Sequence, residues 1–237
     1  FEGSLTMQIQ GKGQLKLAVV DCTSERAMRA IAHFDADVRC DDLLELVGPG
    51  CLAITIEPKQ GRRYQGIVDL TSGDLAKAIE GYMQRSQQLE TKIWLTADRQ
   101  QVAGMMLQKL PQQDDISDSF HEEDVDAWNR ISHLAATVQP QELTDLAFEE
   151  LLRRLFFEEN LRLFDVEPVR FRCSCSKERV SNTLRLLGYD ELKPLLESDN
   201  KVSVNCEFCN HLYEFDSVDI ELLFADAAVP GDATVRH

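Results

Sequence analysis

The sequence lacks any apolar run that approaches the roughly 20 residues needed to cross a bilayer. It also has no basic, apolar leader at its start, no internal repeats and no low-complexity tracts. These absences exclude a membrane-spanning protein and favour a soluble, globular one. With 237 residues and 43% hydrophobic content, we expect one large domain and a smaller one.

An excess of basic charge is missing as well. The formal net charge is −16, which argues against nucleic acid or an anionic membrane as a partner, because both attract clustered Lys and Arg. Residues 1–111 hold 13 basic and 14 acidic side chains, residues 112–172 hold 6 and 15, and residues 173–237 hold 6 and 12. The middle segment therefore stands apart as the most acidic.

The seven cysteines do not form the even set of a secreted disulfide framework. Cys22, Cys40 and Cys51 are scattered, and we expect them to be small buried apolar residues rather than catalytic thiols. A reducing cytosol is the expected location. The sequence also lacks an initiator methionine and opens as though inside a strand, so we expect it to begin partway through a longer gene product.

The pattern of residues 1–111 predicts an α+β domain with a largely antiparallel sheet. A helix is expected over 71–88, capped by Ser72 or Asp74, and a short helix before Gly48-Pro49-Gly50. Alternating apolar and polar residues predict the strands. The expected strands are 5–10, 14–22, 28–34, 51–58, 63–70, 91–98 and 101–111.

An acidic, turn-forming stretch from Pro111 marks the start of a helical linker, residues 112–172. Helices are predicted over 125–138 and over 140–164, the second begun by Pro140. The second helix is so apolar that its surface must be covered. Its apolar residues are Leu143, Leu146, Phe148, Leu151, Leu152, Leu155, Phe156, Phe157, Leu161, Leu163 and Phe164.

Residues 173–237 read as a small unit of short helices and strands that holds the other four cysteines. A C-x-C and, thirty residues later, a C-x-x-C between two short strands predict a tetrahedral Zn²⁺ site. Its expected ligands are Cys173, Cys175, Cys206 and Cys209. His211 could replace one of them, although a supporting role is favoured because four cysteines already complete the shell.

From the residues alone, zinc that only staples a small domain is the simpler interpretation. A redox switch is the alternative, because C-x-C closes only a strained, reversible disulfide. In addition, Arg170, Arg172, Lys177 and Arg179 surround the first pair with positive charge. A nucleic-acid-binding ribbon is disfavoured by the acidic charge of the unit.

These motifs resemble a known family. The C-x-C followed by "SKERV", the later "CEFCNHLYEF", and the upstream "LTMQIQGKG", "RYQGIVDL", "GYMQRSQQLETKIWL" and "LQKLP" are similar, in this order, to the bacterial redox-regulated chaperones known as heat shock protein 33. The resemblance covers nearly the whole chain. That family normally carries a further segment before the first residue of this sequence.

The resemblance implies a cytoplasmic, ATP-independent holdase that binds unfolding clients under oxidative stress and is not an enzyme. Oxidation would form Cys173–Cys175 and Cys206–Cys209 disulfides, release zinc, unfold the zinc unit and the linker, and favour a homodimer. The alternatives are a thiol-disulfide oxidoreductase that uses Cys206 and Cys209, which requires a C-x-x-C that opens a helix, and a zinc-stapled interaction module without a redox role.

Overall fold

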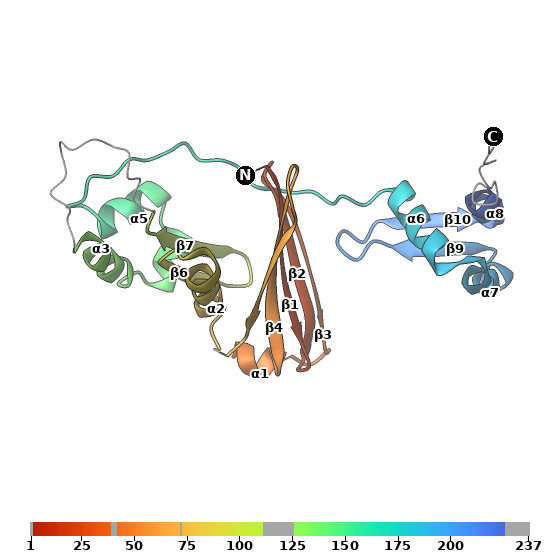
Figure 1. Cartoon of the computed structure of the whole chain (residues 1–237), viewed down its shortest axis with the longest axis horizontal. Helices are drawn as coiled ribbons and strands as arrows, with labels where there is room; N and C mark the ends of the chain where they lie inside the picture. The colour runs from red at the N-terminus through yellow and green to blue at the C-terminus, as the bar shows by residue number, and fades with distance from the viewer. Residues whose placement is uncertain (1, 39–41, 72, 111–125, 226–237) are drawn as a thin grey trace, which may run out of the picture. The chain divides into compact units, whose positions relative to one another are not determined.

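The protein is described by a computed structural model, in which the chain divides into two compact units (Figure 1). The first unit consists of Phe1–Arg26 with Ala32–Val169, and the second of Ala27–Ile31 with Arg170–His237. The residues described are 2–38, 42–71, 73–110 and 126–225. Within these ranges, we find no helix that combines the length and the apolar character required to span a bilayer.

Four antiparallel strands of a six-stranded sheet lie wholly in the first unit. Strand β1 lies between β2 and β4, and β5 pairs with the other side of β4. Met7 is paired with Val20 on one side and Ile54 on the other. The strands are β1 (Gly3–Gly11), β2 (Leu15–Thr23), β4 (Gly50–Pro58) and β5 (Tyr64–Asp69). Side-chain alternation places every second residue on the face that becomes buried.

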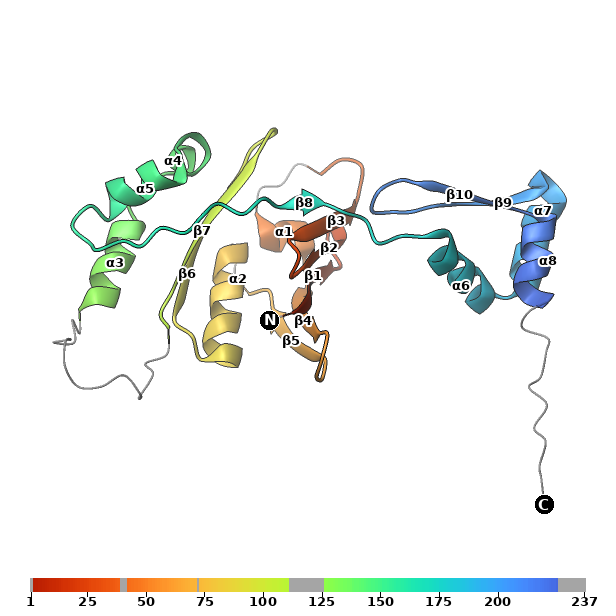
Figure 2. The same ribbon diagram turned by 90° about the horizontal axis from the view of Figure 1, so that it is seen from above.

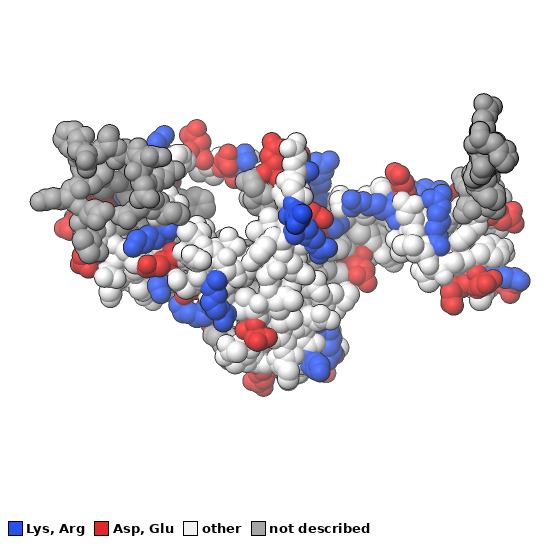
Figure 3. All heavy atoms as spheres, viewed as in Figure 1, with Lys and Arg blue, Asp and Glu red and all other residues white. Residues whose placement is uncertain are grey.

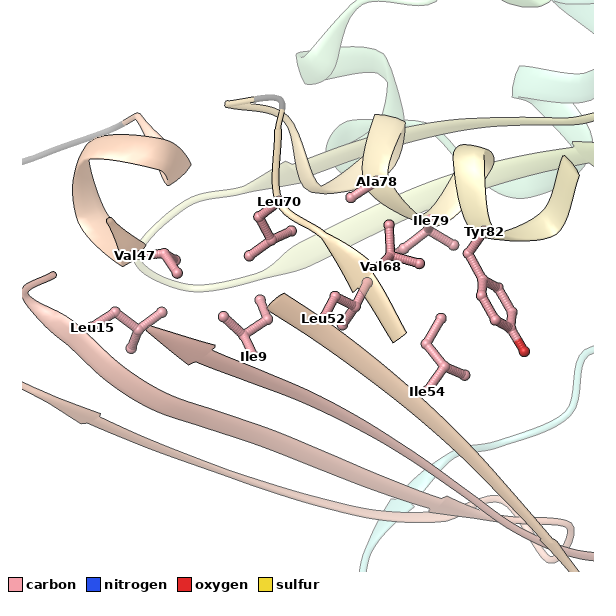
Figure 4. Close-up of a cluster of buried hydrophobic side chains, with 10 residues drawn as sticks. All are labelled: Ile9, Leu15, Val47, Leu52, Ile54, Val68, Leu70, Ala78, Ile79 and Tyr82. Atoms are coloured by element: carbon pink, nitrogen blue, oxygen red, sulfur yellow. The ribbon is translucent and has the colours of Figure 1, made fainter. Parts of the chain in front are cut away.

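Helices α1 (Leu43–Val47) and α2 (Leu75–Tyr82) provide the cover for that face. The Asp74 side chain accepts the Ala76 N–H at 2.8 Å and so begins α2, which confirms one of the two expected caps; Ser72 lies outside the described residues. A π-helical turn, η1 (Met83–Gln87), ends the helix. Figure 4 shows side chains from the strands and from α2 pointing toward one another. This sheet cluster consists of Ile9, Leu15, Val47, Leu52, Ile54, Val68, Leu70, Ala78, Ile79 and Tyr82.

A second apolar cluster lies on a separate hairpin, β6 (Thr91–Ala97) with β7 (Val102–Gln108). Figures 1 and 2 place α2 on one side of this hairpin and α3 (Ala127–Ala135), α4 (Pro140–Asp145) and α5 (Phe148–Leu155) on the other. Ile93 packs against the sheet cluster, whereas its neighbour Trp94 packs against these helices. The linker cluster consists of Ala135, Val138, Leu143, Leu151, Leu155 and Phe156.

The predicted single helix over 140–164 is wrong. The chain forms α4 and α5 instead, because Leu146 and Ala147 adopt extended backbone angles between them. This break lets Leu143 and Leu151 reach the same cluster. After Phe156 the chain forms no helix as far as residue 169. The expectation that the apolar surface is covered holds only in part, since Phe157 and Phe164 remain about three-quarters exposed, at 75% and 77%.

The second unit has its own core, built on a β9–β10 hairpin around Phe215 and Ile220. Strand β3 begins in this unit, where Ala27 and Met28 pair in parallel with β8. Gly188, with a φ of 94°, ends α6 as predicted. The remaining elements are β3 (Ala27–Phe34), β8 (Arg170–Phe171), α6 (Lys177–Leu187), α7 (Tyr189–Asp199), β9 (Lys201–Asn205), β10 (Leu212–Asp216) and α8 (Ser217–Ala225).

The α+β fold class is therefore confirmed, with a large antiparallel sheet, helices and a C-terminal cluster of cysteines. The described helices α3 to α5 lie in the same compact unit as the main sheet. The functional division into a core of residues 1–111, a linker of 112–172 and a zinc unit of 173–237 stays a prediction.

Candidate metal centre

Four cysteine sulfurs meet in the second unit. The Sγ atoms of Cys173, Cys175, Cys206 and Cys209 all lie within 4.8 Å of one another. The Sγ of Cys173 is 3.6 Å from that of Cys206, and the Sγ of Cys175 is 3.4 Å from that of Cys209. In a tetrahedral site with Zn–S bonds of about 2.3 Å, sulfurs lie about 3.8 Å apart. The four donors therefore fit a tetrahedral, thiolate-binding metal such as zinc.

The C-x-x-C pair occupies the turn between β9 and β10. The N–H of Cys206 donates to the carbonyl of His211 at 2.9 Å, and the N–H of Asn210 donates to the carbonyl of Cys206 at 2.7 Å. Asn210 has a φ of +58°, a left-handed conformation that asparagine tolerates better than most residues. These bonds turn both sulfurs toward the same point. The pair thus lies in a hairpin turn and does not open a helix, unlike the thiol-disulfide oxidoreductase motif.

The C-x-C pair connects β8 to α6. The N–H of Arg172 donates to the carbonyl of Met28 at 3.1 Å, which holds the chain just before Cys173. Directly after Cys175, the Ser176 hydroxyl accepts the Arg179 N–H at 3.2 Å and begins α6. The partial positive charge of a helix N-terminus favours thiolate in its neighbourhood. The C-x-C pair is therefore held by β8 just before it in the chain and by α6 just after it.

A basic residue that the sequence did not suggest contacts one of the sulfurs. The Nη1 of Arg29, in β3, lies 3.7 Å from the Sγ of Cys173. In contrast, the Arg179 guanidinium donates to the Ser174 backbone and hydroxyl, and Lys177 pairs with Asp219 at 3.2 Å. Arg29 is 144 residues from Cys173 in the chain, so no local motif could have identified it.

The metal-free thiols differ in acidity. Burial raises the pKa of Cys173, but the Cys175 backbone N–H and thiol, together with the Arg29 guanidinium, outweigh burial and lower it to about 6. The backbone N–H of His211 lowers the pKa of Cys209, whereas the Cys175 sulfur and burial raise it to about 12. The Cys173 thiol therefore ionises well before the Cys209 thiol.

The remaining candidate residues lie outside this group of four. The His211 ring packs edge-on against Tyr213, with the ring centroids 4.6 Å apart, and His211 does not belong to the metal-ligand group. The prediction that Cys22 and Cys51 are buried is wrong, because both side chains are half-buried. They lie in β2 and β4, at positions that the rest of the fold covers only in part. Cys40 lies outside the described residues.

Charged side chains tie the linker helices together. Arg130 of α3 forms an ion pair with Glu159 at 2.7 Å, and Arg154 of α5 forms one with Glu142 of α4 at 2.9 Å. Glu142 also completes a capping box with Gln139 at the start of α4. Among the described residues of the second unit, the face seen in Figure 3 carries both basic and acidic side chains.

Comparison with known proteins places these features in context. A family model described as Hsp33 protein matches residues 1–216. The chain is 44% identical over 236 residues to a 33 kDa chaperonin of Methylobacillus flagellatus, with 99% of this chain and 78% of that protein covered. It is also 44% identical over 237 residues to a 33 kDa chaperonin of Nitrosococcus oceani, with 100% and 79% covered.

A solved structure has a similar fold. It is the 33 kDa chaperonin, a heat shock protein 33 homolog, from Thermotoga maritima, with a TM-score of 0.80 and 20% sequence identity. The match covers 95% of this chain and 79% of that chain. At this identity the likeness concerns the fold alone, and it agrees with the α+β architecture described above.

Proposed function

The chain belongs to the Hsp33 family, and from this premise we propose that it is a redox-regulated, ATP-independent chaperone that binds unfolding proteins under oxidative stress. The observation that carries the proposal is the gathering of four Sγ atoms within 4.8 Å, contributed by two cysteine pairs far apart in the chain. Such a centre can hold a metal when its thiols are reduced and lose it when they are oxidised.

In the reduced state, Cys173, Cys175, Cys206 and Cys209 would bind one Zn²⁺. When bound, the ion would keep all four sulfurs as thiolates and contribute folding free energy to the second unit. That unit is small, and its core depends on a few side chains such as Phe215 and Ile220. Its fold should therefore depend on the state of the four sulfurs.

The proposed switch is oxidation within each pair. The thiolates of Cys173 and Cys175 would join in one S–S bond, and those of Cys206 and Cys209 in another, with two electrons leaving each pair. Two molecules of hydrogen peroxide accept these four electrons and, with four protons, become four molecules of water. The sulfurs would then no longer be metal ligands, and the second unit would lose the Zn²⁺ ion that stabilises it.

Opening of the linker helices would follow. Helices α3 to α5 cover one face of the β6–β7 hairpin, including Trp94 and Met105. Their release would expose these residues together with the apolar side chains of the helices. Exposed apolar patches bind unfolded chains. This surface, added to the already exposed Phe157 and Phe164, is the proposed site for client proteins.

The further parts of the proposal concern assembly and location. We expect a homodimer in the oxidised state, a cytoplasmic location, and partners that are unfolding proteins rather than nucleic acid or membranes. We expect no enzymatic turnover. The position of Cys206 and Cys209 in a hairpin turn argues against the thiol-disulfide oxidoreductase alternative.

The experiment compares untreated and peroxide-treated protein in suppressing aggregation of a heat-unfolding client, with released zinc followed by a chromogenic chelator. Protection should appear only after treatment and rise together with zinc release. Equal protection in both states would refute the switch and favour the zinc-stapled module. Peptide mapping should find Cys173–Cys175 and Cys206–Cys209 disulfides; bonds that join the two pairs would contradict the proposed chemistry.

A substitution at the centre tests the coupling to the linker. Cys173→Ser removes one ligand, so it should lower zinc affinity by at least about tenfold and speed hydrogen exchange in α3 to α5 without any oxidant. Cys22→Ser is the matched control, because Cys22 lies in β2 and is not one of the four grouped cysteines. Unchanged exchange in the linker helices of Cys173→Ser would show that the centre does not hold them.

A further inference from the structure

Arg29 contacts one sulfur of the C-x-C pair and a side chain in the turn that carries the C-x-x-C pair. Resting on the proposed function above, we propose that Arg29 is a positioning residue that fastens the four-cysteine centre to strand β3, so that the pairing of β3 with β8 depends on the redox state of the sulfurs. The guanidinium and the backbone around it make separate contacts, and each supports this role.

The guanidinium lies between the two pairs. Its Nη1 is 3.7 Å from the Sγ of Cys173, within the range for a hydrogen bond to sulfur. Its Cζ lies 4.0 Å from the centroid of the Phe208 ring, a cation–π contact. Phe208 stands between Cys206 and Cys209 in the turn. One planar side chain therefore holds a sulfur of the first pair and the turn that carries the second.

The backbone next to Arg29 supports the same contact. Met28 is paired with Phe171 in the parallel β3–β8 ladder, and its carbonyl accepts the N–H of Arg172 at 3.1 Å. Arg29 directly follows Met28, and Cys173 directly follows Arg172. The ladder is only two residue pairs long. A pairing this short needs side-chain support, and the Arg29 guanidinium supplies it at its end.

The other basic side chains near the centre have different partners. Arg179 donates to Ser174, at 3.1 Å to the carbonyl and 2.8 Å to the hydroxyl, and Lys177 pairs with Asp219. These contacts stay within α6 and α8 and the chain that leads into α6. Arg29, in contrast, reaches a cysteine sulfur from outside the segment 170–237.

Oxidation would weaken these two contacts of the guanidinium. A disulfide sulfur carries no charge and accepts hydrogen bonds weakly, so the bond from Arg29 to Cys173 would be lost. A change in the Cys206–Cys209 turn would withdraw the Phe208 ring. Residues Ala27–Ile31 of β3 lie in the second unit and the rest of the strand in the first. The state of the sulfurs is thereby passed to a strand that continues into the first unit.

The test uses the full chain, untreated and loaded with zinc, and measures amide exchange at Arg172. Arg29→Gln should speed this exchange about fivefold and speed zinc release by a fixed concentration of peroxide in the same direction. Arg29→Lys keeps the charge without the planar stacking and should fall between Arg29→Gln and the unmodified protein. Arg26→Gln is the matched control, since Arg26 pairs with Glu167 at 2.8 Å and touches no sulfur.

The proposal would be overturned if Arg29→Gln and Arg26→Gln gave the same rate of amide exchange at Arg172 and the same rate of zinc release. If Arg29→Gln does not fold with a full complement of zinc, Phe208→Leu replaces it, because this variant removes the ring without changing charge; exchange equal to that of the unmodified protein would then overturn it. Failure of the proposed function would appear separately, as unmodified protein that binds no zinc or releases none with peroxide.

Discussion

The two apolar clusters of the first unit differ in how completely their side chains are buried. In the sheet cluster, Val47 is 0% exposed, and Leu52, Ile54 and Tyr82 are each 1% exposed. In the linker cluster only the small Ala135 is fully buried, and the larger members keep 4–9% of their surface exposed. The large side chains with less than 2% exposure include none from the linker cluster. The sheet cluster is therefore the more deeply buried of the two.

The difference follows from the elements that build each cluster. The sheet cluster rests on strands of up to nine residues paired on both sides. The linker cluster rests on a two-stranded hairpin and on helices of nine, six and eight residues. Two-stranded hairpins and short helices are each marginal in water without further packing. Loss of packing should therefore open the linker helices first.

The largest expected effect comes from the sheet cluster. Leu52→Ala removes a fully buried side chain and leaves a cavity, so we expect it to lower the free energy of unfolding by about 3 kcal/mol. Urea denaturation of the zinc-bound protein, followed by far-UV circular dichroism, measures this loss. A loss below about 1 kcal/mol would contradict the depth assigned to this cluster.

In the linker cluster, Leu151→Ala should act locally. We expect it to destabilise the closed linker by about 2 kcal/mol, because Leu151 is buried against the hairpin but surrounded by a thinner layer. Hydrogen exchange should accelerate in α3 to α5 while amides of β4 keep their protection. Leu152→Ala is the control: Leu152 is half-buried against the same cluster, so this variant should accelerate exchange less than Leu151→Ala. Equal acceleration in β4 would mean that the two clusters unfold together.

A smaller effect is expected at the ion pair between Arg130 and Glu159. The Glu159 side chain is only 19% exposed and receives two bonds from the guanidinium, at 2.7 and 3.3 Å. Arg130→Gln should weaken the closed linker by about 1 kcal/mol and increase client protection at low oxidant. Lys77→Gln, which disrupts the ion pair with Glu80 outside the linker, should leave both quantities unchanged.

The smallest effect is expected at Asp98, in the turn between β6 and β7. The backbone N–H groups of Gln100 and Gln101 donate to Asp98 and hold the pKa of its carboxyl below 3.8. A pKa lowered in the folded state means that this support is present above the ordinary pKa and is lost as the pH falls through the lowered value. NMR titration of the two amides should give midpoints below 3.8, and a midpoint at or above this ordinary value would contradict the contact.

Much of the fold could be predicted from the sequence because its signals are local. Alternation predicted the strands, Asp74 began α2, and Gly188 ended α6. The two cysteine pairs were predicted to meet because sulfur spacing of this kind is a property of metal sites. The strand and helix predictions depend on residues a few positions apart, and each cysteine pair is itself a local motif.

The features that the sequence did not reveal depend on distant contacts. The break between α4 and α5 occurs because Leu143 and Leu151 pack on the same hairpin, which begins some fifty residues earlier. The contact of Arg29 with Cys173 spans 144 residues. The two faces of the β6–β7 hairpin, one for each cluster, emerge only once α2 and the linker helices are in place.

The arrangement of the sulfurs also decides what a covalent bond would do to the chain. The short distances join the pairs crosswise, Cys173 to Cys206 and Cys175 to Cys209. A crosswise disulfide would close a ring of more than thirty residues and restrict the unfolded chain, which stabilises a fold by about 4 kcal/mol. Disulfides within C-x-C and C-x-x-C close rings of only a few residues. Oxidation would thus stabilise the fold of the second unit if disulfides joined the two pairs, but would leave the unit able to unfold if each disulfide formed within a pair.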